Sequence, residues 1–155
     1  MIFGDPYVFA LQLDVVKSWN APGDIWRNGV FTVYVDGEKV FNCLDVAELR
    51  TTVNFYLKLP LSSIVFSDAV LDFVELFNHV DDYYTGDGEL LDGSTCSLTC
   101  TVMEDNGCYM YYQSHVAGDK FFWSLDRGAT VKGALLPGGV LRQVIDQLSR
   151  VDLVI

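Results

Sequence analysis

Short runs of alternating apolar and polar residues, separated by tight turns, most limit how this chain can fold. In residues 7–16 every second side chain from Phe9 to Val15 is apolar, which predicts a half-buried strand. Residues 30–35 and 39–43 are rich in β-branched and aromatic side chains. The Asp36-Gly37 pair between them predicts a hairpin.

Two segments after these strands change to the spacing of a helix. Asp45 followed by Glu48 predicts a capping box, and Pro60 ends the helix that it starts. A second helix is predicted from Ser67 or Asp68 to about residue 80. Its apolar stripe would consist of Val70, Phe73, Val74, Phe77 and Val80.

The rest of the chain returns to strands and ends in a helix. Residues 81–95 lack periodicity and hold three glycines, which predicts a long loop. Asn106-Gly107 predicts a hairpin turn between strands at 96–103 and 108–116. Further strands are predicted at 120–125, after the turn Gly118-Asp119, and at 129–136, followed by a helix beyond Pro137.

The order of these elements predicts the fold class. Strands joined by tight turns pair antiparallel, so we expect an α+β fold, with an antiparallel β-sheet built from hairpins and about three helices packed mainly on one face. The length of 155 residues fits a single domain spanning residues 1–155. The four cysteines form no CxxC pair and are predicted to be reduced and buried: Cys43, Cys96, Cys100 and Cys108.

Charge is distributed unevenly along the chain. The net charge is −11, and no Lys or Arg lies between Lys58 and Lys120, an interval that holds 11 of the 21 acids. Such a surface repels phosphate backbones and anionic lipid, so we expect neither nucleic-acid nor membrane binding. A basic protein partner fits this charge. The same carboxylates are also compatible with nothing more than a solvated helix face and hydrated turns.

The middle of the chain supplies the candidate contact residues. Tyrosines set among carboxylates suit an interface because they combine rigid apolar area with a polar tip. They are equally compatible with packing on the edge of the core. The predicted partner-binding residues are Asp81, Asp82, Tyr83, Tyr84, Asp87, Glu89, Asp92, Glu104 and Asp105.

No catalytic, metal or cofactor motif accompanies these residues. His79 and His115 lack a third group that would orient a nucleophile and base. The acidic run from Asp81 to Asp92 departs from the calcium-loop pattern, and no glycine-rich phosphate loop precedes a helix. We therefore predict no catalytic residues, no metal and no cofactor.

The beginning of the chain favours a cytoplasmic location. The segment MIFGDPYVFALQL has no basic stretch at its start and no small-residue cleavage pattern. No stretch reaches the roughly 18 apolar residues of a membrane span. The sequence carries no signal about the oligomeric state.

The N-terminal third contains a series of short motifs. They are Gly4-Asp5-Pro6, FALQLDVV at 9–16, Trp19-Asn20, Trp26-Arg27-Asn28-Gly29, VYVDGEKVF at 33–41 and DVAELRTT at 45–52. With the ending FFWSLDRGATVKGALLPGGVLRQVIDQL at 121–148, they resemble immunity protein family 42, bacterial proteins that accompany polymorphic toxins. The resemblance is strongest at 4–52 and weakest at 60–119.

This resemblance implies a non-enzymatic protein that binds and blocks a cognate toxin domain in the producing cell's cytoplasm. It supplies no list of binding residues, so placing partner specificity in the acidic middle is an inference from charge. Two alternatives remain open at this point. One is an acidic adaptor or subunit of another assembly, and the other is a hydrolase that uses the carboxylates of the acidic loop.

Overall fold

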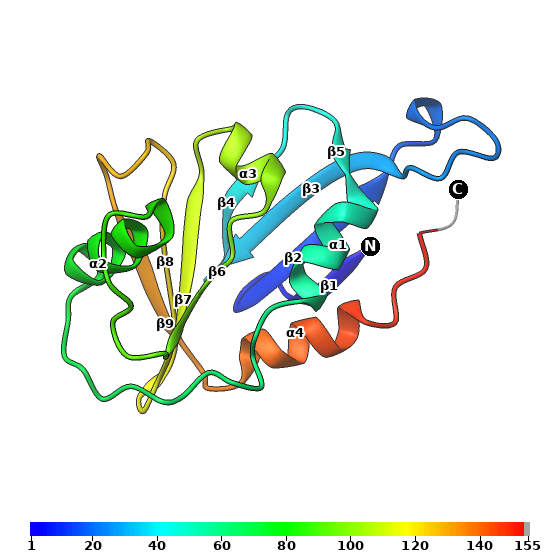
Figure 1. The fold of residues 1–155 in the computed structure, drawn as a ribbon. Coiled ribbons are helices and arrows are strands. Elements are labelled where there is room, and N and C mark those ends of the chain that lie inside the picture. The colour runs from blue at the N-terminus through cyan, green and yellow to red at the C-terminus, as the bar shows by residue number, and fades with distance from the viewer. Residues whose placement is uncertain (154–155) are drawn as a thin grey trace. The chain divides into compact units, whose positions relative to one another are not determined.

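The computed structural model describes residues 1–153 and has an α+β fold (Figure 1). Every described strand pairing within its two sheets is antiparallel. The predicted fold class is therefore confirmed, although the strands form two sheets and not one. In chain order the elements are β1 (Ile2–Asp5), β2 (Phe9–Val15), a 3-10 turn (Lys17–Trp19), β3 (Asn28–Val35), β4 (Glu38–Asn42), β5 (Ala47–Glu48), α1 (Leu49–Leu57), α2 (Phe73–Thr85), β6 (Thr95–Ser97), α3 (Thr101–Asp105), β7 (Tyr109–His115), β8 (Gly118–Ser124), β9 (Lys132–Leu136) and α4 (Val140–Leu148).

The chain divides into two compact units, which we describe separately. The flanking unit comprises Met1–Lys58, Cys100–Val102 and Val140–Ile155, and the central unit comprises Leu59–Thr99 and Met103–Gly139. α3 carries residues of both units.

The flanking unit is built on the five-stranded sheet. Its strands follow the order β1-β2-β3-β4, and β5 pairs with β3. Helices α1 and α4 contact each other and pack on β1, β2 and β3. Phe31 lies at the centre of this core, with the rings of Phe41 and Tyr56 at centroid distances of 6.0 and 5.8 Å. Alternation from Phe9 to Leu13 therefore buries the apolar face that the sequence predicts.

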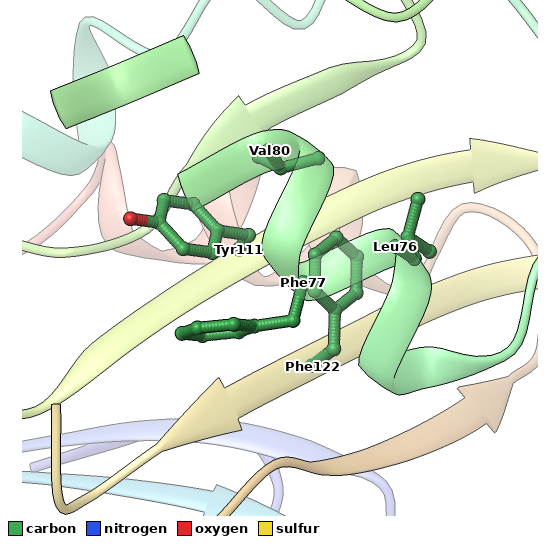
Figure 2. Close-up of a cluster of buried hydrophobic side chains, with 5 residues drawn as sticks. All are labelled: Leu76, Phe77, Val80, Tyr111 and Phe122. Carbon is green, nitrogen blue, oxygen red and sulfur yellow. The ribbon is translucent and has the colours of Figure 1, made fainter. Parts of the chain in front are cut away.

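The central unit is built on the four-stranded sheet β6-β7-β8-β9. Helix α2 crosses this sheet and contacts β7, β8 and β9. Its buried residues Leu76, Phe77 and Val80 pack with Tyr111 of β7 and Phe122 of β8 (Figure 2). This helix thus brings its own C-terminal end to the sheet near Tyr111.

Helix α1 begins later than the sequence indicates. The predicted cap Asp45 is wrong, because Glu48 is the N-cap and its carboxylate accepts hydrogen bonds from the backbone N–H groups of Arg50 and Thr51. Burial opposes the charge of Glu48, but hydrogen bonds led by that from the Arg27 backbone outweigh it and lower its pKa. The helix ends at Leu57, before Pro60 as predicted.

Helix α2 is also displaced from its predicted position. A start at Ser67 or Asp68 is wrong, since Asp72 caps the helix and forms a capping box with Glu75. Val70 lies before the helix and is fully exposed, so it is not part of the apolar stripe. The helix continues to Thr85, so the first five residues of the predicted loop are helical.

The predicted hairpin around Asn106-Gly107 is wrong, and the strand predicted at 96–103 ends at Ser97. Residues 101–105 form α3, and the backbone N–H groups of Asn106 and Cys108 both donate to the carbonyl of Met103. Gly107 has a φ of 72° and ends this helix. A left-handed glycine serves a helix end as well as a hairpin turn, so the dipeptide alone does not distinguish them.

Three smaller differences concern the strands. Strand β1 lies outside every predicted strand and pairs with β2. Strand β3 begins at Asn28, two residues before the strand predicted at 30–35. Gly118 and Asp119 begin β8 and do not form the turn before it. The strands at 39–43, 108–116 and 129–136 and the last helix are confirmed within a few residues.

All four cysteines are free and buried, as predicted. Burial raises the pKa of Cys96 to about 12, and burial also raises the pKa of Cys43. Cys43 and Cys100 belong to the flanking unit, and Cys96 and Cys108 to the central unit.

Candidate functional site

Negative charge is concentrated in the central unit. This unit contains 12 Asp and Glu residues and three basic residues, a net charge of −9. The flanking unit contains nine acids and seven bases, a net charge of −2. All nine predicted contact residues belong to the central unit.

Four of these residues lie together at the C-terminal end of α2. They are Asp81, Asp82, Tyr83 and Tyr84. The side chains of Tyr83 and Tyr84 are 38% and 43% exposed, and their rings meet edge to face at a centroid distance of 5.0 Å. Asp82 is exposed and Asp81 is half-buried. The end of the helix therefore presents a tyrosine pair beside carboxylates.

Tyr111 of β7 fixes this helix end to the sheet. Its hydroxyl donates a hydrogen bond of 2.6 Å to Asp81 Oδ1, and its ring stacks on Tyr84 with centroids 5.6 Å apart and planes 17° apart. Burial, assisted by the Asp81 carboxylate, raises the pKa of Tyr111, so the hydroxyl remains a donor. Tyr111 also packs on Phe77 and Phe122 (Figure 2). Stacking on Tyr111 therefore connects Tyr84 to the buried core.

The anchor Tyr111 was absent from the predicted contact set. Alternation along 108–116 indicates that Tyr111 and Gln113 share one face of a strand. It does not indicate which helix covers that face. The role of Tyr111 depends on its tertiary contact with α2, and local alternation of side chains does not predict such a contact.

Asp81 and Asp82 occupy the helix end where negative charge is least favourable. Carbonyl groups give the C-terminus of a helix a partial negative charge, and no basic side chain lies in the last turn of α2. The Asp82 carboxylate, which lies in the last turn, costs on the order of 0.3–1 kcal/mol. A local choice that opposes helix stability is typical of a functional position.

The loop after α2 folds back on the same helix end. The backbone N–H groups of Asp87 and Gly88 donate to the carbonyl of Asp82 at 2.9 and 3.0 Å. The side chains of Asp87 and Glu89 are exposed. We refer to Asp81, Asp82, Tyr83, Tyr84, Asp87 and Glu89 as the α2-end surface.

Asp92 has a structural role that the sequence did not indicate. Its Oδ2 accepts a hydrogen bond of 2.6 Å from Ser67 Oγ, and its Oδ1 accepts one of 3.0 Å from the Ser94 backbone N–H as well as one from Ser94 Oγ. Burial opposes ionisation, but these hydrogen bonds outweigh it and lower the pKa of Asp92. Asp92 thus ties the segment before α2 to the start of β6.

Glu104 and Asp105 form a third group, on α3. Both side chains are exposed, and the Gly107 N–H donates to the Glu104 carbonyl at 2.9 Å. By their hydrogen bonds and ring contacts, the nine predicted residues therefore fall into the α2-end surface, Asp92 beside Ser67, and the pair on α3.

One of the acids between Lys58 and Lys120 is buried and adds no exposed charge. Asp119 is buried, and its Oδ1 accepts hydrogen bonds from the Tyr112 hydroxyl at 3.0 Å and the Gly139 N–H at 3.2 Å. Counting carboxylates along the sequence therefore overstates the exposed charge by this residue.

Residues 1–153 contain no group of three or more His, Cys, Asp and Glu side chains that could hold a metal ion. Within the same described range, no helix is long and apolar enough to cross a membrane. His115 is engaged within the fold: its Nε2 lies 3.1 Å from the Ala69 carbonyl, and its Nδ1 accepts from the Ala117 N–H.

Comparison with known proteins identifies relatives of this arrangement. A family model described as immunity protein 42 matches residues 1–151. The crystal structure of CdiI from Burkholderia dolosa AUO158 is similar, with a TM-score of 0.79 and 19% sequence identity over 97% of this chain and 100% of that chain. At this identity the likeness shows a shared fold. No curated protein matches the sequence.

Proposed function

Because this chain belongs to the immunity protein 42 family, we propose that it neutralises its toxin by presenting the α2-end surface to a basic surface of the toxin domain. The family is one of bacterial toxin-neutralising immunity proteins. The observation that carries the proposed contact is the exposed tyrosine pair, fixed to the core by Tyr111 and surrounded by carboxylates in a unit of net charge −9.

Electrostatics and packing have separate tasks in this proposal. Carboxylates on one unit attract a basic partner over about a Debye length, roughly 8 Å at physiological ionic strength, and raise its association rate. Tyr83 and Tyr84 then supply apolar area at low entropic cost, because Tyr84 is held by stacking before the partner arrives. A standard interface of about 1,600 Å² is large enough for such a complex.

Three finer features belong to the same proposal. The chain acts by occupying the toxin and performs no catalysis of its own. It works in the cytoplasm, where the toxin would otherwise attack the producing cell. Residues 1–155 form one domain, and Asp92, Glu104 and Asp105 extend the contact surface beyond the α2 end. The family match over residues 1–151, which includes both units, supports the single domain.

The test measures association between this chain and the toxin domain encoded by the adjacent gene, at several salt concentrations. The double variant Asp82→Asn/Asp87→Asn removes two exposed charges from the α2-end surface with little change in shape. We expect its association rate at low salt to fall roughly tenfold, with a shallower salt dependence.

A matched control removes two exposed charges from the flanking unit. Glu38→Gln/Asp45→Asn makes the same change in net charge, and both residues are exposed. We expect its association rate to stay within about twofold of the unaltered chain. Equal losses in both double variants would reduce the effect to net charge and refute the α2-end surface. No binding by the unaltered chain would refute this toxin as the partner.

A further inference from the structure

Residues 65–70 form a strap that is bonded to the sheet of the central unit before α2 begins. The Ser67 N–H donates to the Ser114 carbonyl, and the Ser67 carbonyl accepts from the Val116 N–H, both at 2.9 Å. Ser67 and His115 pair as a parallel bridge. The hydroxyl of Ser67 donates to Asp92 at 2.6 Å. The backbone of the strap is therefore held in one conformation.

The strap is also held on both sides of Ser67. The Val65 N–H donates to the Gly93 carbonyl at 3.3 Å. On the other side, the Ala69 N–H donates to Ser67 Oγ at 3.2 Å, and the Ala69 carbonyl lies 3.1 Å from His115 Nε2. Ser67 is buried, so its neighbours Phe66 and Asp68 point away from the sheet.

Three large apolar side chains of the strap, and Val116 in the turn after β7, are exposed to solvent. The exposed fractions are 52% for Val65, 75% for Phe66, 95% for Val70 and 67% for Val116. Single exposed apolar residues are ordinary on protein surfaces, but three within six residues of a hydrogen-bonded segment, with a fourth on the turn bonded to it, favour an interaction site. Because the backbone is already ordered, a partner that covers these side chains loses little entropy on binding.

The charges around the strap indicate what covers it. Asp68, Asp72 and Asp92 are exposed, and no basic residue occurs between Lys58 and Lys120. Exposed apolar side chains on a segment that also carries exposed carboxylates are complementary to a protein surface that combines apolar and basic groups. A second copy of this chain does not fit, since like charges would face each other.

From these observations we infer that the strap is a second docking site for the toxin, in which Phe66 and Val70 are the apolar anchors. The inference rests on the proposed function and adds to it. Asp92, one of the predicted contact residues, is the hydrogen-bond acceptor of Ser67 and so belongs to this second region. The α2-end surface governs the rate of association, and the strap governs the rate of dissociation.

The test compares dissociation of the toxin complex for the unaltered chain and for the double variant Phe66→Ser/Val70→Ser. Loss of two anchors is expected to weaken binding roughly 30-fold, mostly through faster dissociation, and to leave the salt dependence of association unchanged. Thermal stability should change little, because neither side chain is buried in the free chain.

A control variant tests whether any exchange of an exposed apolar residue for serine in the central unit weakens binding to the same extent. Leu135→Ser also exchanges a half-exposed apolar residue of the central unit, on β9, and is expected to alter affinity by less than about threefold. Unchanged dissociation in the strap variant, or an equal loss in Leu135→Ser, would refute the strap while leaving the proposed function intact. Failure of the unaltered chain to bind the toxin would refute both.

Discussion

The two units share a helix packed on an antiparallel sheet but differ in the charged side chains that make their internal hydrogen bonds. Each lays a helix across an antiparallel sheet, α4 in the flanking unit and α2 in the central unit. In the flanking unit, Arg27 donates to backbone carbonyls, including that of Leu153 at 2.8 Å. In the central unit, carboxylates such as Asp81 and Asp92 accept from hydroxyls.

This difference shows how a surface charge arises as part of the fold. In the flanking unit acids and bases nearly balance, so little net field remains. The central unit uses carboxylates as internal acceptors and retains almost no bases to offset the rest. Binding function and fold therefore share residues in the central unit, and variants should affect the two units differently.

The largest expected effect comes from truncating the core of the central unit. Phe77→Ala removes a fully buried ring that packs on Tyr111, and we expect a loss of about 3–5 kcal/mol in the free energy of unfolding. Hydrogen exchange should show lost protection first in α2, β7 and β8. The matching variant Leu141→Ala in α4 should expose flanking amides first. Equal loss of protection in both units for either variant would contradict local opening and indicate that the single domain opens as a whole.

A second comparison uses the glycine beneath each helix. An added Cβ at Gly133 would lie 2.2–2.5 Å from the ring of Phe73, so we expect Gly133→Ala to cost about 1–3 kcal/mol. An added Cβ at Gly4 would lie 2.2 Å from the Phe9 carbonyl oxygen, where φ is also +93°. A backbone oxygen cannot move aside as a side chain can. We therefore expect Gly4→Ala to lower the free energy of unfolding, measured with urea, more than Gly133→Ala does. A smaller cost at Gly4 would contradict this reasoning.

The third prediction concerns Asp92 and pH. Its pKa is lowered in the folded chain, so its stabilisation is complete above the ordinary carboxyl pKa of about 4 and disappears as pH falls through the folded value. Asp92→Asn should therefore cost about 1 kcal/mol at pH 7, measured by urea unfolding, and almost nothing near pH 2. Glu38→Gln, in the flanking unit, serves as the control. A penalty that persists in acid would show that shape and not charge matters at Asp92.

The smallest expected effect has the opposite sign. Asp82→Asn removes a negative charge from the C-terminal end of α2 and should stabilise the chain by about 0.3–1 kcal/mol, measured by thermal unfolding. The reverse applies at the N-terminal end, where Glu75→Gln removes a negative charge from the first turn of α2 and should destabilise the chain slightly. If Asp82→Asn stabilises the chain without slowing its association with the toxin, Asp82 does not contribute to binding.

Much of this fold follows from local patterns. Strand β2 and helix α4 are predicted because their apolar side chains recur at the spacing of a strand and of a helix. Strands β7 and β9 are predicted from turn residues and strand-type composition. Helix starts are less predictable where acids and serines follow one another. Asp45 and Glu48 both offer a cap for α1, and Ser67, Asp68 and Asp72 all do so for α2. Tertiary contacts decide among them.

The candidate site is predictable in composition but not in arrangement. The basic-free interval marks the central unit, and the Tyr83-Tyr84 pair marks its most prominent feature. Stacking of Tyr84 on Tyr111 joins residues far apart in sequence, and no local pattern reveals it. The strap is hidden for a similar reason, because the spacing of Val70 and Phe73 imitates a helix face.

The buried cysteines provide each unit with its own chemical reporter. Thiolate, not thiol, reacts with alkylating reagents, and burial keeps the pKa of Cys96 at about 12 while hiding all four sulfurs from solvent. Alkylation of Cys43 or Cys100 thus requires opening of the flanking unit, and alkylation of Cys96 or Cys108 requires opening of the central one. Alkylation followed by mass spectrometry on the unaltered chain then shows which unit opens first. Repeating it with bound toxin shows whether binding suppresses that opening.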